Sequence, residues 1–175
     1  LLVKVTMDIN VMKTITFLFF SLFFVPDAFT QDVTKAMKYF NSEKYDSAAT
    51  EFEAVLPVIE KKYGATDTSY YLKLVNYAAQ SFDESGQFKK AEQYYLKIIS
   101  ICETINTKWD TVFVNSLSNL AVMYMSKGRF EQAEPLLKRA VEIEKSQLGE
   151  NNHLYANDLE NLAYSIYMLG RYEES

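Results

Sequence analysis

The sequence predicts an all-α protein, an α-solenoid built from stacked antiparallel helix pairs. The tripeptide Asn119-Leu120-Ala121 returns as Asn161-Leu162-Ala163. A second tripeptide, Gly128-Arg129-Phe130, returns as Gly170-Arg171-Tyr172, and both offsets are 42 residues. Between these landmarks, apolar residues recur at helical spacing. One helix pair cannot bury its apolar face alone, so units repeating at this period are expected to stack around one continuous core.

The composition is that of a folded chain. It has 175 residues, of which 49% are hydrophobic, so it is too apolar to be disordered. Its net charge is −5 and no basic run follows residue 30, which argues against nucleic-acid binding because that activity depends on neutralising phosphates. A single cysteine, Cys102, and a single histidine, His153, cannot make an internal disulfide or a Cys/His zinc site. We therefore expect no cofactor, no metal and no catalytic residue.

Residues 1–30 differ from the rest and are predicted to be a secretory leader. Met12-Lys13 precedes an apolar run at 15–25. The small residues Ala28 and Thr30 follow, and cleavage is predicted between Thr30 and Gln31. The run is shorter than the ~20 residues that span a bilayer, so membrane contact is expected only if the leader stays uncleaved. A buried helix is the remaining alternative. The Phe-rich leader resembles those of exported bacterial proteins, which implies the periplasm or the exterior.

Residues 31–175 form one predicted repeat domain of helix, turn, helix units. One position of the repeat holds a small residue in every unit. At a second position, glycine ends the first helix of three units, because a residue in the left-handed conformation allows the last backbone carbonyls of the helix to be hydrogen-bonded. The small residues are Ala36, Ala79, Ala121 and Ala163, and the glycines are Gly86, Gly128 and Gly170. The predicted units are 31–67, 68–109, 110–152 and an incomplete 153–175. The expected helices are 33–41, 45–63, 68–85, 88–105, 111–127, 130–148 and 154–169.

These residues resemble the tetratricopeptide repeat (TPR). The 42-residue period and the pattern N-L-A-x6-G-[RK]-[FY]-x2-A-E-P-L…L-G-E-N are similar to those of the kinesin-light-chain-like branch. The resemblance covers 31–175 and is weakest in the first unit, where Glu43 replaces the turn glycine and Pro57 is expected to interrupt the second helix. Loop detail also departs from the family at 149–156, at Thr107 and at Trp109.

In this family the first helix of each unit lines a concave groove that holds a partner peptide. Mapped by the resemblance, the candidate peptide-binding positions are Lys73, Asn76, Tyr77, Gln80, Asn115, Asn119, Val122, Asn157, Asn161 and Tyr164. The asparagines form i, i+4 pairs on two helices, and each amide offers a donor and an acceptor to a peptide backbone. The alternative is that these asparagines bond to neighbouring helices and define the repeat. Lys73 is the only basic residue in the set, so a clamp for C-terminal carboxylates is not expected.

The resemblance implies a non-enzymatic protein–protein interaction scaffold that binds an extended, neutral or mildly basic segment. The alternative is the recognition or regulatory arm of a larger exported or signalling protein. At the end of the repeats, Leu162, Ile166 and Tyr172 are expected to face water, which would allow a homodimer through this open face. Glu144 and its charged neighbours are expected to form a solvated helix face.

Overall fold

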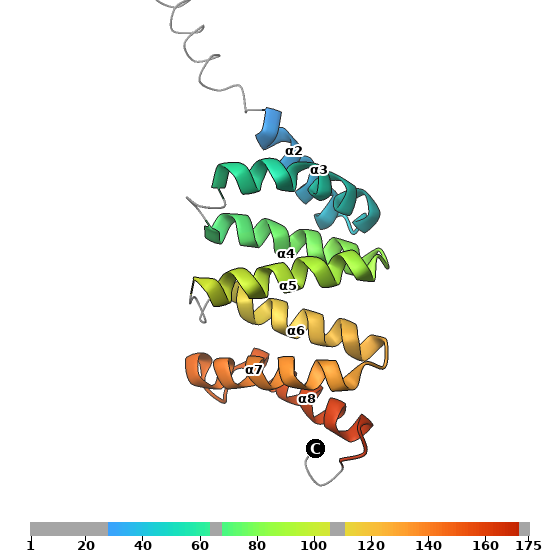
Figure 1. Cartoon of the computed structure of the whole chain (residues 1–175), viewed down its shortest axis with the longest axis vertical. Helices are drawn as coiled ribbons and strands as arrows, with labels where there is room; N and C mark the ends of the chain where they lie inside the picture. Colours follow the sequence, from blue (N-terminus) through green and yellow to red (C-terminus); the bar gives the residue numbers. More distant parts are fainter. Residues whose placement is uncertain (1–27, 64–67, 106–110, 172–175) are drawn as a thin grey trace, which may run out of the picture.

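The computed structural model describes residues 28–63, 68–105 and 111–171. These residues form seven α-helices and no strand (Figure 1). The helices are α2 (Ala28–Asn41), α3 (Tyr45–Tyr63), α4 (Thr68–Glu84), α5 (Phe88–Thr104), α6 (Thr111–Ser126), α7 (Phe130–Leu148) and α8 (His153–Met168). The all-α helical repeat predicted from the sequence is confirmed.

The helices are stacked one after another along the long axis of the molecule (Figure 1). Each helix contacts the next one along the chain, so consecutive helices pack as pairs. In addition, α4 contacts α6 and α6 contacts α8, although a second helix intervenes in sequence each time. The first helices of successive pairs therefore adjoin one another. We call α4, α6 and α8 the first-helix layer; α3, α5 and α7 are the second helices.

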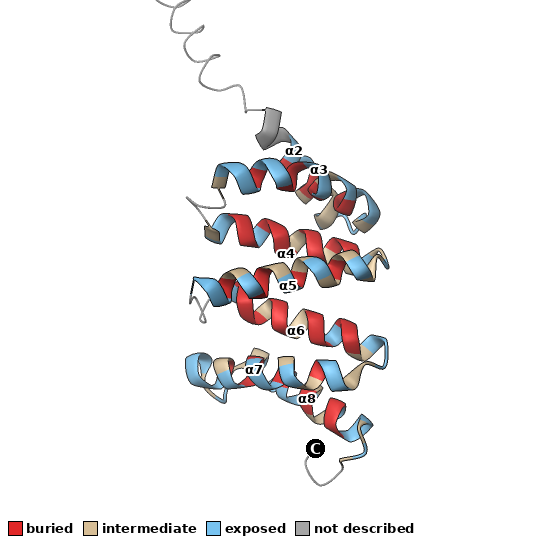
Figure 2. Cartoon of the chain, viewed as in Figure 1, coloured by how far each residue is buried: buried red, intermediate tan, exposed pale blue. Residues whose placement is uncertain are grey.

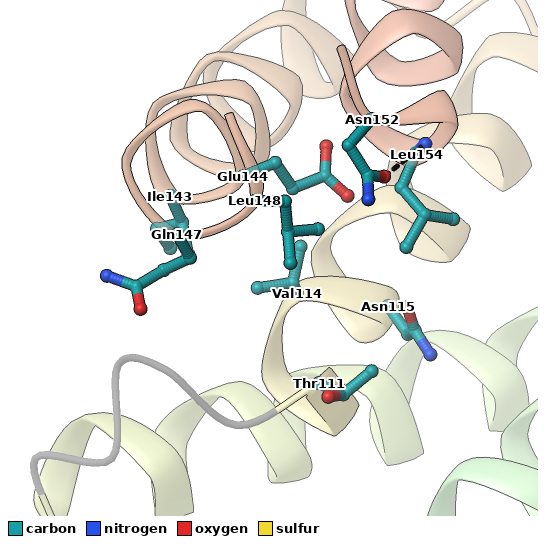
Figure 3. A pocket seen from close by; sticks show the side chains of 9 residues that line it. All are labelled: Thr111, Val114, Asn115, Ile143, Glu144, Gln147, Leu148, Asn152 and Leu154. Atoms are coloured by element: carbon teal, nitrogen blue, oxygen red, sulfur yellow. Dashed lines mark hydrogen bonds between the residues drawn. The ribbon is translucent and has the colours of Figure 1, made fainter. Parts of the chain in front are cut away.

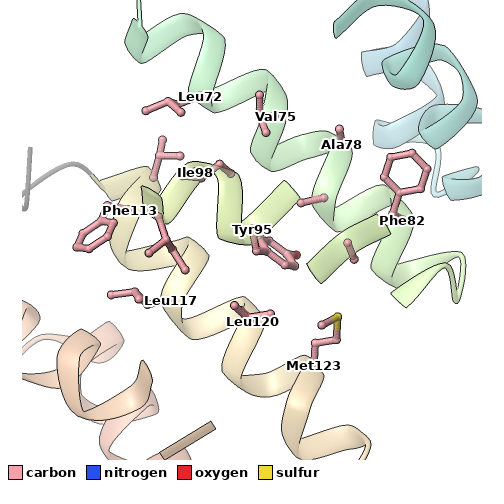
Figure 4. Close-up of a cluster of buried hydrophobic side chains, with 14 of the residues drawn as sticks. Leu72, Val75, Ala78, Phe82, Tyr95, Ile98, Phe113, Leu117, Leu120 and Met123 are labelled. Carbon is pink, nitrogen blue, oxygen red and sulfur yellow. The ribbon is translucent and has the colours of Figure 1, made fainter. Parts of the chain in front are cut away.

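The core runs continuously through the stack because each helix buries one apolar face (Figure 2). Figure 4 shows side chains of α4, α5 and α6 meeting in it, among them Leu72, Tyr95 and Leu117. Ala79 and Ala121, at the aligned small position, are fully buried. A small side chain at this position lets close-packed helices approach one another. The recurrence of alanine is therefore a packing requirement.

The turns between the two helices of a unit use a residue in the left-handed conformation. Gly86, Gly128 and Gly170 have φ angles of 75°, 69° and 77°. The turn after α2 uses Glu43 instead, at φ 56°, and its N–H donates to the Phe40 carbonyl at 3.0 Å. A side chain in this conformation costs about 1 kcal/mol relative to glycine. The first unit thus keeps the turn geometry of the repeat without the residue that suits it best.

Repeated ion pairs join the second helix of one unit to the next unit. Arg129 lies 3.1 Å from Glu92, and Arg171 lies 2.8 Å from Glu134, one repeat later. Similar pairs connect neighbouring units at Lys90–Glu53, Lys97–Glu60 and Arg139–Glu103. Exposed pairs of this kind contribute at most about 1 kcal/mol each. They explain why Arg and Glu recur with the repeat, while burial of apolar surface holds the units together.

The helix bounds lie within one residue of the expected ones, except in the first unit. There, α2 begins at Ala28 instead of residue 33. The predicted break at Pro57 is wrong, because α3 continues through it. Pro57 removes the hydrogen bond to the Glu53 carbonyl, but both residues lie on the exposed side of α3, where water can satisfy that carbonyl.

Most of the predicted leader, residues 1–27, lies outside the described residues. Helix α2 starts before the predicted cleavage site and includes the bond between Thr30 and Gln31. Among the helices that the structure describes, none is both long and apolar enough to span a membrane. Cleavage and export therefore stay predictions from the sequence.

The last helix buries two of the residues that were expected to face water. Leu162 and Ile166 are buried as α8 packs on α7, so that expectation is wrong for both; Tyr172 lies outside the described residues. The exposed large apolar residues of α8 are Leu159, Tyr164, Tyr167 and Met168. Leu159 is 41% exposed, whereas Leu117, its equivalent one unit earlier, is 0% exposed. Helix α8 thus leaves open a surface that is covered in the preceding unit.

Candidate partner-binding face

The predicted groove positions all lie on the first-helix layer, but they differ in accessibility. The exposed ones are Lys73, Val122, Asn157 and Tyr164, and the half-buried ones are Tyr77, Gln80, Asn115, Asn119 and Asn161. Asn76 is buried, and its Oδ1 atom has no hydrogen-bond partner among the described residues. Asn76 therefore lies inside the stack, while the other nine positions have some surface to offer a partner.

A hollow of about 220 Å³ brings several of these positions together. Its lining is Gln80, Asp83 and Glu84 from α4, Tyr95 from α5, and Asn119 and Val122 from α6. Three predicted groove residues thus meet in one depression, although they come from helices in different units. Direct contact between α4 and α6 explains this meeting.

The amide of Asn119 is held in place by Tyr95, which also lines the hollow. Asn119 hydrogen-bonds to the hydroxyl of Tyr95, a side chain that is almost fully buried. Burial raises the pKa of Tyr95 further above its ordinary value, which already lies well above physiological pH, so this hydroxyl is neutral. Asn119 therefore has a structural partner in the neighbouring helix, as the alternative interpretation of the asparagines expected.

The α4 rim of the hollow is acidic. Asp83 and Glu84 stand side by side there. Partial burial and the Glu84 carboxylate raise the pKa of Asp83, while Lys127 acts in the opposite direction. Carboxylates accept hydrogen bonds and attract positive charge. The hollow consequently suits a segment with donor groups or a positive charge better than an acidic one.

On α8, the predicted groove residue Asn161 contacts a buried carboxyl group. Asp158 is buried and accepts hydrogen bonds from the hydroxyl of Ser118 on α6 and from Asn161 on its own helix. Asn161 is therefore engaged within the protein, as Asn119 is. Asn157, one turn before Asn161, is exposed.

A second pocket, of about 280 Å³, opens where α6 begins, α7 ends and α8 begins (Figure 3). It is lined by Thr111, Val114, Asn115, Ile143, Glu144, Gln147, Leu148, Asn152 and Leu154. Asn115 is the one predicted groove residue in this lining. The Oδ1 atom of Asn152 accepts from the N–H of Leu154 at 2.9 Å, which caps the start of α8. The pocket is therefore bounded by a fixed helix terminus.

Glu144 in this pocket was missed by the sequence analysis, and its predicted place on a solvated face is wrong. Its side chain is buried, with 3% of the residue exposed. Figure 3 shows its carboxyl group pointing from α7 into the space between Leu148 and Asn152. The repeat alignment contained the missing signal, because Glu144 occupies the position of Ile59 and Cys102, which are both fully buried.

Two carboxyl groups therefore meet between α7 and α8. Burial, which has the larger effect, and the adjacent Asp158 together raise the pKa of Glu144 to about 7. Burial also raises the pKa of Asp158, while its hydrogen bonds to Ser118, Asn161 and Glu144 act in the opposite direction. Glu144 is thus the group that carries the shared proton near neutral pH. Within the described residues, no group of three or more His, Cys, Asp or Glu side chains is placed to hold a metal.

The comparisons with solved structures identify the architecture. A crystal structure of nearly identical TPR-like repeats described as a Podosopora anserina kinesin light chain is 19% identical, with a TM-score of 0.70, over 82% of this chain and 68% of that one. A variant of it matches at 20% identity with the same score and coverage. BtubC (BKLC) from P. vanneervenii matches at 14% identity and a TM-score of 0.52, over 85% of this chain and 75% of that one. These likenesses show the fold.

The sequence matches identify the type of repeat. No curated protein matches this sequence. Two family models, both described as Tetratricopeptide repeat, match residues 69–105 and 113–175. Together these two ranges span more than half of the chain; the first covers α4 and α5, and the second covers α6, α7 and α8. Residues 69–105 and 113–175 are therefore tetratricopeptide repeats.

Proposed function

We propose that this chain is a non-enzymatic scaffold whose first-helix layer binds an extended segment of a partner protein. Tetratricopeptide repeats generally mediate protein–protein interactions and are typically non-enzymatic. The observation that carries the proposal is the hollow between α4 and α6, where Gln80, Asn119 and Val122 meet. Such a depression accepts one side chain, and its neighbours along the layer offer room for the rest of the segment.

The chemistry of the layer supports a neutral or basic segment. Val122 and Tyr164 are about half exposed and offer apolar area, and the tyrosine adds a polar tip. Asp83 and Glu84 border the hollow, and only Lys73 among the predicted positions carries a positive charge. An apolar side chain flanked by donor groups is the pattern that fits these contacts.

Replacing Val122 with lysine is expected to weaken peptide binding by about tenfold or more, because it removes an apolar contact from the hollow and obstructs it with a long side chain. Binders would first be selected from displayed random peptides on the immobilised protein. The Kd of each selected peptide would then be measured by fluorescence polarisation with the wild type and with the Val122→Lys variant.

Val58 provides a matched control for this experiment. It is also a valine and is 51% exposed, close to the 46% of Val122, but it lies on the second helix α3. Val58→Lys is therefore expected to leave the Kd unchanged. Equal Kd values for both variants would show that the selected peptides bind elsewhere and would overturn the proposed face.

The alternative function, a recognition arm within a larger exported protein, is favoured by one observation. The exposed face of α8 includes Leu159, whose equivalents Leu117 and Val75 are fully buried in the two preceding units. An apolar surface of this kind is suited to packing against a further helix or a second copy of the chain. In this form the first-helix layer would position a partner for the rest of the assembly.

A further inference from the structure

The pocket between α6, α7 and α8 combines apolar walls with one unsatisfied acceptor. Val114, Ile143, Leu148 and Leu154 provide the apolar walls. The Oε2 atom of Glu144 is buried and has no hydrogen-bond partner among the described residues. A buried acceptor without a donor is destabilising, so a group that supplies a donor here is bound favourably.

Asp158, in contrast to Glu144, has hydrogen-bond donors. Its carboxyl group already accepts from Ser118 and Asn161, and it is hydrogen-bonded to Glu144 as well. The donors are thus concentrated on Asp158, whereas Oε2 of Glu144 is buried without a partner among the described residues. The carboxyl group that carries this atom points into the space between Leu148 and Asn152, which line the pocket (Figure 3). The unsatisfied position is therefore a single, well-defined oxygen atom.

Three features select the kind of ligand. The cavity of about 280 Å³ lies just below the roughly 300–1,000 Å³ of small-molecule pockets, so it suits one side chain. Apolar walls suit an aliphatic stem. A single available oxygen suits the point charge of an ammonium group, because a guanidinium group prefers two parallel acceptors.

We propose that this pocket binds a lysine side chain of the partner segment, with its ammonium group donating to Oε2 of Glu144 and its methylene groups against Val114 and Leu148. The assignment rests on the proposed function, since the lysine belongs to the same bound segment. It adds a specificity-determining contact at one end of the layer. Asn115, already a predicted groove residue, lines the same pocket from α6.

Binding of the ammonium group is coupled to loss of a proton. Before binding, the pKa of Glu144 is about 7, and Asp158 is the charged group that faces it from α8. The lining residues of α6 are Thr111, Val114 and Asn115, which do not titrate, and Lys145 on α7 is paired with Glu150 at 2.6 Å. The incoming positive charge favours the ionised carboxylate, so the proton leaves to solvent. Binding is accordingly expected to be tighter at pH 8 than at pH 6.

The probe for this proposal is lysine blocked as its N-acetyl, N-methylamide derivative, and the matched control probe is the same molecule acetylated on Nζ. Chemical shifts of the methyl groups of Val114, Ile143, Leu148 and Leu154 would be followed by NMR during titration at pH 8 and pH 6. The lysine probe is expected to shift these signals, more strongly at pH 8, while the acetylated probe has little effect.

Glu144→Gln is expected to weaken binding of the lysine probe by about tenfold or more, because it removes the negative charge but keeps the shape. Glu142→Gln makes the same charge change on the exposed side of α7 and is expected to leave binding unchanged. A thermal unfolding curve for each variant checks that the fold is intact.

Equal binding of the two probes, or full retention of binding by Glu144→Gln, would overturn the lysine pocket. So would an affinity that does not change between pH 6 and pH 8. Failure of the proposed function has a different signature, because peptides selected on the protein would then be insensitive to Val122→Lys. If Val122→Lys weakens peptide binding but the lysine probe shifts none of the methyl signals, only the lysine-pocket assignment is overturned, and the proposed function stands.

Discussion

Replacing Leu117 with alanine is expected to lower the free energy of unfolding by about 2–5 kcal/mol, the range for large-to-small changes in a packed core. Leu117 is 0% exposed and lies within the cluster formed by α4, α5 and α6 (Figure 4). Its removal leaves a cavity in the middle of the stack, where neighbouring helices on both sides limit relaxation. Urea unfolding followed by circular dichroism measures the change.

Leu159 supplies the matched control, because it is the same residue at the same repeat position. It is 41% exposed, so Leu159→Ala is expected to cost about 1 kcal/mol or less. Similar losses for both variants would contradict the account of α8 as an uncovered helix. The recognition-arm alternative predicts that, in the natural assembly, Leu159→Ala costs nearly as much as Leu117→Ala.

Glu144→Gln is expected to stabilise the protein at pH 8 and to have little effect at pH 5. The folded-state pKa of Glu144 is about 7, against an ordinary value of 4.5. Above pH 7 the buried group must ionise, which favours the unfolded chain. Each unit of pKa shift corresponds to about 1.4 kcal/mol, so the penalty at pH 8 is on the order of 3 kcal/mol.

The sign of this effect follows from proton binding. As the pH falls from 7 toward 4.5, the folded protein takes up a proton at Glu144 before the unfolded chain does, so the wild type gains stability over this range. Glutamine stays neutral and can still donate a hydrogen bond to Asp158, so the variant lacks this gain. Denaturant unfolding of both proteins at several pH values measures the difference.

Glu142→Gln serves as the control for the pH series, because Glu142 is exposed on the same helix. Its effect is expected to stay within about 0.5 kcal/mol and not to change with pH. A wild type and a Glu144→Gln variant with parallel pH dependences would show that Glu144 does not titrate in this range. The buried pair would then have a different proton distribution from the one described here.

The helices and turns were predictable because their signals are local. Gly128 and Gly170 mark helix ends by a backbone conformation that glycine adopts most easily, and helical spacing marks the buried faces. Even Glu43 could be placed, since the repeat alignment set it at a turn position. The break expected at Pro57 is absent, because α3 continues through this residue. The expectation that proline interrupts a helix did not take into account that Pro57 lies on the side that faces water, where the lost hydrogen bond can be replaced.

The details of the site depend on contacts between units and were therefore less accessible from the sequence. Leu162 and Ile166 were assigned to the open end, but packing on α7 covers them. Asn119 and Asn161 occupy equivalent positions, yet one bonds to Tyr95 on another helix and the other to Asp158 on its own. Glu144 was judged by its charge, although its repeat position is an interior one.

The most direct test of the proposed binding face is photo-cross-linking of a selected peptide that carries a photoreactive residue, with the attachment sites mapped by mass spectrometry. We expect attachment to residues of the first-helix layer, centred on Gln80, Val122 and Tyr164. Attachment centred on the second helices, at exposed residues such as Val58 on α3 or Leu96 on α5, would contradict it.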